Sequence, residues 1–157
     1  MALAPTSRAI LLGGALAGTG DILFALCFNA WRGVPPLRLL QAVASGALGR
    51  AALEGGLATA ALGLALHLAL SFGWAATFWL AARRVPALAR HAAAAGIAFG
   101  VVVFLAMRLV VLPLSAFPFP VRWTWIGTVP DLLSHMLLFG LPIALCARQA
   151  LASRARG

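Results

Sequence analysis

Charged residues are scarce in this sequence, and acidic residues most of all. Only 10% of the 157 residues are charged, and three of them are acidic, namely Asp21, Glu54 and Asp131. Hydrophobic residues make up 63% of the chain, and the mean hydropathy is +1.01. A soluble domain of this length could not bury so much apolar surface. The composition therefore excludes a water-soluble globular protein and indicates a chain surrounded by lipid.

Lysine is absent, and all twelve basic residues are arginine. We interpret this bias as a feature of genome composition rather than of function. The formal net charge of +9 does not indicate nucleic-acid binding, because the arginines form no patch. They lie at the ends of apolar segments, where positive charge orients a membrane protein. The expected partner is the lipid bilayer, and no nucleic acid is expected.

The sequence also lacks the ten-residue alternating pattern of a membrane β-barrel. Instead, four stretches approach or exceed the roughly 20 apolar residues that a spanning helix needs. They cover about residues 9–29, 55–82, 93–114 and 130–147. We predict an all-α fold, a bundle of four transmembrane helices that forms a single integral membrane domain over residues 1–157. No second domain or internal repeat is recognised.

Two shorter segments connect these spans on the side away from the termini, here called the outer side. Residues 35–48 begin with Pro35 and Pro36 and are apolar but too short to span, which predicts a short helix at the outer interface or a re-entrant piece. Residues 115–130 contain three prolines and two tryptophans, which predicts an ordered outer loop.

Four spans place both termini on one side of the membrane. That side would carry seven arginines, Arg8, Arg83, Arg84, Arg90, Arg148, Arg154 and Arg156, and the other side four, Arg32, Arg38, Arg50 and Arg122. The excess predicts a multi-pass protein with both termini in the cytoplasm. The tryptophans fit this frame, with Trp31, Trp123 and Trp125 at the outer boundary and Trp79 at the inner one.

Cysteine occurs only at Cys27 and Cys146. The first lies near the outer end of the first span and the second near the inner end of the fourth. At 1.5 Å per helical residue they are about 20 Å apart along the membrane normal, which is beyond the reach of a disulfide. We expect two buried free thiols.

Each span carries polar or small residues at helical spacing, so that one face points into the bundle. Counting depth from the centre of each span predicts a buried polar cluster of Asp21, His67, Arg108 and His135. Because a charge in the membrane needs a partner, we predict an Asp21–Arg108 ion pair. We favour a structural pair that fixes helix register over a proton or anion relay.

Other residues on these faces have secondary roles. The secondary polar residues are Asn29, Glu54, Ser71 and Asp131. Asp131 follows Pro130 and is expected in the first turn of the fourth span, near the outer rim. The glycines expected at close helix contacts are Gly14, Gly18, Gly63, Gly96 and Gly100.

Several short motifs in the second half of the chain suggest a family. They are HLALSFGWAATFW with His67 and Ser71, the turn RRVP, GIAFG, VVLPLSAF with Pro113, and DLLSHMLLFGLPIAL. Over roughly residues 60–148 the sequence resembles the YagU-like family of small, functionally uncharacterised bacterial inner-membrane proteins. The resemblance implies a location in the bacterial inner membrane and four membrane helices with a histidine on the second and another on the fourth, and it implies no substrate, cofactor or reaction.

Three functions fit these features. We favour an accessory or binding membrane protein, acting as a homo-oligomer or with a membrane partner subunit. The first alternative is a small proton-linked transporter or permease that works as an oligomer and uses the polar cluster. The second is an electron-transfer protein with haem b between His67 and His135. No other cofactor and no metal site is expected, and the absence of a nucleophile or acid–base constellation argues against an enzyme.

Overall fold

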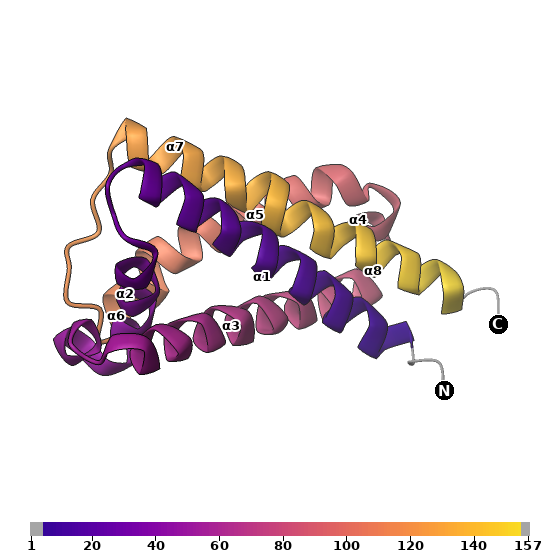
Figure 1. Ribbon diagram of the computed structural model, residues 1–157. Coiled ribbons are helices and arrows are strands. Elements are labelled where there is room, and N and C mark those ends of the chain that lie inside the picture. The colour runs from indigo at the N-terminus through magenta and orange to yellow at the C-terminus, as the bar shows by residue number, and fades with distance from the viewer. Residues whose placement is uncertain (1–4, 155–157) are drawn as a thin grey trace.

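The protein is a bundle of long helices that lie side by side (Figure 1). The computed structural model describes residues 5–154. In chain order the helices are α1 (Pro5–Trp31), α2 (Pro36–Leu48), the 3₁₀ turn η1 (Gly49–Leu53), α3 (Gly56–Arg84), α4 (Pro86–Arg90), α5 (Ala92–Ala106), the π-helical segment η2 (Met107–Val111), α6 (Leu112–Leu114), α7 (Trp125–Ser134), the π-helical segment η3 (His135–Gly140) and α8 (Leu141–Arg154). No strand occurs within residues 5–154.

Four continuous helical stretches are long and apolar enough to cross a membrane. They are Thr6–Trp31, Gly56–Arg84, Ala92–Leu114 and Trp125–Ser153. The predicted all-α bundle of four membrane helices is therefore confirmed. Both described chain ends lie at one end of the bundle, here called the terminal end, and α2 and α6 lie at the other, the loop end (Figure 1). Arg156 lies outside the described residues.

The fourth span differs from its prediction because it begins at Trp125 rather than at Pro130. Thr124 is the N-cap of α7, and its hydroxyl oxygen accepts a hydrogen bond from the Gly127 N–H at 3.2 Å. The Thr128 hydroxyl accepts one from the Thr124 N–H at 3.0 Å. These bonds satisfy free donors at the helix start, so Pro130 lies inside the helix instead of starting it.

The predicted segment 35–48 forms helix α2, which packs on the loop-end half of α3. Figure 1 views this helix nearly end on, so it runs across the bundle rather than along it. Gly63 of α3 lies directly against the backbone of Leu40 in α2. The Gln41 amide donates to the carbonyl of Gly56 at 3.1 Å, and an Arg38 guanidinium nitrogen donates to that of Leu53 at 2.6 Å. These contacts fix α2 against the start of α3.

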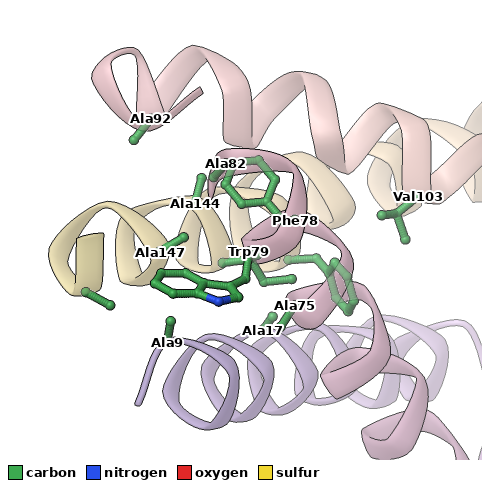
Figure 2. Close-up of a cluster of buried hydrophobic side chains, with 13 residues drawn as sticks. Ala9, Ala17, Ala75, Phe78, Trp79, Ala82, Ala92, Val103, Ala144 and Ala147 are labelled. Carbon is green, nitrogen blue, oxygen red and sulfur yellow. The ribbon is translucent and has the colours of Figure 1, made fainter. Parts of the chain in front are cut away.

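The terminal half has an alanine-rich core around one tryptophan. Trp79 of α3 is only 1% exposed and lies among Ala9, Ala17 and Ala147 of the first and last helices (Figure 2). The prediction of an interfacial Trp79 is therefore wrong, because this indole faces the bundle axis. The other three predicted interfacial tryptophans are exposed.

The two cysteines are free thiols, as expected. Cys27 is exposed on the surface of α1, however, so its predicted burial is wrong. Cys146 is partly buried.

Glycines let the helices approach closely at three contacts: α1 with α3, α3 with α2, and α5 with the fourth span. Gly14 and Gly18 of α1 lie against Phe72 and Ser71 of α3. Each of the five glycines named from the sequence lies where a Cβ atom would collide with a neighbouring helix. At Gly63, Gly96 and Gly100 the nearest atoms include the neighbouring backbone, so glycine lets the helices pack backbone to backbone there, as is common in membrane bundles.

Candidate functional site

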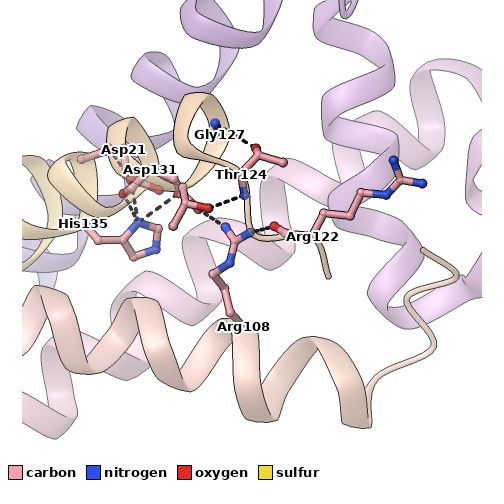
Figure 3. A network of polar contacts seen from close by, with 9 residues as sticks. Asp21, Arg108, Arg122, Thr124, Gly127, Asp131 and His135 are labelled. Carbon is pink, nitrogen blue, oxygen red and sulfur yellow. Dashed lines mark hydrogen bonds and ion pairs between the residues drawn. The ribbon is translucent and has the colours of Figure 1, made fainter. Parts of the chain in front are cut away.

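Four charged or titratable side chains form one network at the loop end of the bundle (Figure 3). His135 Nδ1 lies 2.9 Å from the backbone carbonyl oxygen of Asp131, 3.3 Å from the Asp131 carboxylate and 3.7 Å from the Asp21 carboxylate. All three neighbours are hydrogen-bond acceptors, so Nδ1 carries a hydrogen. Asp131 also pairs with Arg108, which gives the continuous order Asp21, His135, Asp131, Arg108.

Arg108 is held from several sides. One terminal nitrogen donates to the Asp131 carboxylate at 2.9 Å, and the other donates to the backbone carbonyl of Arg122. The guanidinium carbon lies 5.2 Å from the ring centre of Phe104 and 4.8 Å from that of Trp123, within cation–π range. This side chain thereby joins the third span to α7 and to the loop before it. Its Nε–H is buried and has no partner among the described residues.

Asp21 connects the first span to the fourth. Its carboxylate accepts a hydrogen bond from the Ser134 hydroxyl at 2.6 Å, and both residues are buried. A short bond to an ionised acceptor is stronger than one between neutral groups. Ser134 therefore helps to keep a buried carboxylate in place.

The predicted Asp21–Arg108 ion pair is wrong, because Arg108 pairs with Asp131 instead. The prediction placed Asp131 in the first turn of its helix, near the outer rim. The helix begins at Trp125, so Asp131 lies in its second turn. That position brings its carboxylate to the depth of Arg108 and between the two residues expected to pair.

The other polar residues named from the sequence lie apart from this ion-pair network. His67 Nε2 is 2.9 Å from the Gly18 carbonyl oxygen, and the Ser71 hydroxyl donates to the His67 carbonyl at 2.8 Å. The Asn29 amide donates to the Ala25 carbonyl at 2.8 Å. Glu54 is exposed where η1 ends, away from the network.

Two π-helical segments carry the arginine and the histidine of the network. These segments are Met107–Val111 and His135–Gly140. Each is followed two residues later by a proline, Pro113 or Pro142. A proline ring clashes with the carbonyl four residues earlier and offers it no N–H. In both cases that carbonyl lies in the π segment, where the wider turn removes the clash. Such π turns are frequent at functional sites.

A cavity of about 800 Å³ opens beside the network. It lies between α1, α2 and α3 on one side and α5, η2, α7 and η3 on the other. In the terminal half α3 and α5 are held together by the rings of Phe78 and Phe99, whose centres are 5.0 Å apart. The charged and imidazole side chains on the cavity wall are Asp21, Arg32, His67, Arg108, Arg122, Asp131 and His135. All four members of the predicted cluster thus share one cavity.

Most of the remaining wall is apolar. Phe24 and Phe28 come from α1, Leu39 and Val43 from α2, and Trp74 from α3. Asn29 and Ser71 also line the cavity, whereas Glu54 does not. The result is an apolar chamber with a polar network on one wall.

Sequence reasoning missed three contributors to the site. Ser134 was not among the residues named from the sequence, although its hydroxyl donates to the Asp21 carboxylate. Phe104 and Trp123 enclose the Arg108 guanidinium. For Phe104 the signal was present, because it precedes Arg108 by one helical turn. The sequence could not predict the contact with Trp123, because this residue lies in a loop and its position depends on the path that the loop takes.

The structure does not favour the predicted haem site. Both histidines line the cavity, but His67 Nε2 is bonded to a backbone carbonyl, so this nitrogen carries a hydrogen. His135 Nδ1 is likewise bonded to a backbone carbonyl, that of Asp131 at 2.9 Å. Iron ligation through His67 Nε2 would break its existing hydrogen bond. Among the described residues no group of three or more His, Cys, Asp and Glu side chains is arranged to hold a metal ion.

Comparisons of this chain with protein-family models, with curated proteins and with solved structures found no match. The resemblance to the YagU-like family therefore stays a prediction, and the function has to be argued from the site itself.

Proposed function

We propose that this protein binds an amphipathic, lipid-like molecule in the loop-end cavity. The observation that carries the proposal is the cavity itself, about 800 Å³ of mostly apolar space with a polar network on one wall. Binding sites for small molecules commonly have 300–1,000 Å³ and combine apolar walls with a few placed polar groups. This is a specific form of the binding function predicted from the sequence.

The charges on the wall favour a neutral or anionic polar group on that molecule. The wall carries three arginines and two aspartates, which leaves one positive charge in excess when both imidazoles are neutral. Arg108 is already paired, but Arg32 and Arg122 have no acidic partner among the described residues. A cationic headgroup would meet this excess unfavourably.

The membrane setting is part of the proposal. The arginine excess at the terminal end supports a cytoplasmic location for that end and a periplasmic one for the cavity, in a bacterial inner membrane. The exposed leucines of all four spans are compatible with a homo-oligomer or a membrane partner subunit.

Native mass spectrometry of protein extracted in mild detergent tests the proposal. We expect one lipid-like mass per chain in the wild type. Ala25→Phe, which places a ring on the cavity wall, should remove it. The matched control Ala30→Phe lies on the same helix, is exposed and does not line the cavity, so it should keep the ligand.

Two results would contradict ligand binding in this cavity. One is a wild type that carries no added mass across a lipid titration, and the other is equal retention by both phenylalanine variants. A mass matching haem, or a second protein in fixed ratio, would instead support the cofactor or partner alternatives.

Proton-linked transport is the second candidate, and one specific observation favours it. The Asp21, His135 and Asp131 side chains are contiguous and reach the cavity. The four-residue network has a net charge of −1 with neutral His135 and becomes neutral when one proton is added. Buried acidic and histidine chains of this kind form proton relays in transporters.

Proton flux into sealed proteoliposomes separates the two candidates. Under transport, wild-type protein should carry protons and Asp21→Asn should abolish the flux while the protein remains folded and inserted. Flux that is absent from the wild type, or that persists unchanged in Asp21→Asn, would exclude this network as the proton path.

A further inference from the structure

The terminal end of the bundle carries a strong positive charge that the chain itself does not balance. Its exposed arginines come from α1, α3, α4 and α8, namely Arg8, Arg83, Arg84, Arg90 and Arg148. The protein has only three acidic side chains. Asp21 and Asp131 belong to the network in the other half, and Glu54 lies at the loop end. Acidic groups that neutralise these arginines must therefore come from outside the protein's own side chains.

Three of these arginines surround one small pocket. It has a volume of about 360 Å³ and is bounded by Arg83 at the end of α3, Arg90 in α4 and Arg148 in α8. The chain turns sharply between Arg84 and Pro86, and α4 folds back against α8. This turn places Arg83 and Arg90 beside Arg148, which comes much later in the sequence.

The rest of the pocket wall is apolar. Ala82, Pro86, Ala89, Leu151 and Ala152 complete it. A soluble anion such as inorganic phosphate prefers donors on all sides, whereas this pocket offers positive charge together with hydrocarbon. That combination suits a molecule whose charged group and acyl chains are joined.

We propose that this pocket binds the headgroup of an anionic phospholipid, with the first acyl carbons against its apolar wall. The pocket lies where two membrane-length helices end, α3 and the fourth span, beside the short helix α4, and the end of a spanning helix is the depth of lipid headgroups. Basic pockets between transmembrane helices are known to bind such lipids, and each arginine near the membrane surface contributes roughly 1 kcal/mol of attraction. This site is separate from the loop-end cavity and does not depend on the function proposed for it.

The chain provides a matched control for this proposal. Arg84 is adjacent to Arg83, belongs to the same helix and is also exposed, but it does not line the pocket. Replacing either residue by glutamine removes one positive charge at the same membrane depth. A general electrostatic attraction would treat these two variants alike, whereas a lipid site would distinguish them.

Lipid binding is measured by native mass spectrometry of the full chain titrated with phosphatidylglycerol or with phosphatidylcholine of the same acyl composition. We expect phosphatidylglycerol to bind more tightly than phosphatidylcholine. Arg83→Gln, Arg90→Gln and Arg148→Gln should each weaken that binding about fivefold, as the loss of one surface arginine predicts. Arg84→Gln and the cavity variant Ala25→Phe should leave it unchanged. Melting curves in phosphatidylcholine alone check that every variant is folded.

Three outcomes would overturn the proposal. Equal weakening by Arg84→Gln and Arg148→Gln would show diffuse attraction by the whole positive end. Equal binding of the two lipids would show an apolar groove without headgroup recognition. Displacement of phosphatidylglycerol by inorganic phosphate at matched concentration would show a site for soluble anions.

Discussion

Replacing Arg108 by glutamine is expected to destabilise the protein by about 2 kcal/mol, since it leaves Asp131 without its cation and frees the carbonyl of Arg122. Breaking a fully buried ion pair by removing one partner costs about 3–5 kcal/mol. The Arg108 side chain is 15% exposed, but that of Asp131 is 39% exposed, which reduces the expected effect. Loss of the stacking on Phe104 and Trp123 adds to the destabilisation.

A double-mutant cycle identifies the partner of Arg108. We expect Arg108→Gln and Asp131→Asn to be non-additive by about 0.5–3 kcal/mol, the range for residues in contact. The control cycle combines Arg108→Gln with Asp21→Asn. Because Arg108 and Asp21 are not in direct contact in the structure, this cycle should give a smaller interaction energy. The readout is the free energy of unfolding in mixed micelles. A larger coupling to Asp21 than to Asp131 would contradict the network described here.

The predicted Asp21–Arg108 ion pair was the main error made from the sequence. Its cause lies in the few residues at the start of the fourth span. Pro130 is a normal helix start by composition, but the capping bonds of Thr124 start the helix five residues earlier. Depth counted from the wrong start placed Asp131 at the rim. A single capping threonine in a loop rich in aromatic residues and proline is hard to recognise from sequence. The hydrophobic pattern that predicts the spans is much easier to recognise.

The π-helical segments also limit what spacing can predict. Residues were assigned to faces with 3.6 residues per turn, and a π turn shifts every later residue around the helix. Pro113 and Pro142 mark the two places where this happens. The four cluster residues nevertheless reach one cavity, because each lies on the small and polar face that its helix turns inward.

Length and apolar composition were sufficient for the four spans, because a membrane helix must satisfy its own backbone hydrogen bonds. They were not sufficient to predict the burial of Trp79. Its depth in the membrane was estimated, but the side of the helix on which it lies was not considered. It lies four residues after Ala75 and three before Ala82, and both alanines are buried. Spacings of three and four residues place Trp79 on the same helix face as these buried alanines, which indicates a core tryptophan. The prediction considered only the distance of Trp79 from the helix end.

The network also connects the helices that form one wall of the cavity. The Arg108 side chain joins the third span to α7 and to the loop before it, and Asp21 joins the first span to the fourth. These links hold the first, third and fourth spans together along one wall of the cavity.

The glycine contact between the third and fourth spans leads to the second large effect. Gly100→Ala is expected to destabilise the protein by about 1–3 kcal/mol, the usual range for overpacking. A Cβ atom at this position would lie 2.6 Å from Cα of Met136 and would collide with the carbonyl of His135. Both neighbours are backbone atoms, so no side-chain rotation relieves the clash. The two helices must separate, which moves His135 relative to Asp21 on the first span.

Gly73→Ala is the matched control, because it makes the same change inside a spanning helix where no atom of another helix lies within 4 Å of the new methyl group. Alanine favours a helix over glycine by about 1 kcal/mol, so this variant should melt at the same temperature as the wild type or slightly higher. Melting of both variants in the same detergent provides the comparison. The expected order is Gly100→Ala below wild type, with Gly73→Ala at or above it. Equal melting temperatures for the two variants would mean that the third and fourth spans are not in backbone contact at Gly100, and the placement of His135 beside Asp21 would then have to be revised.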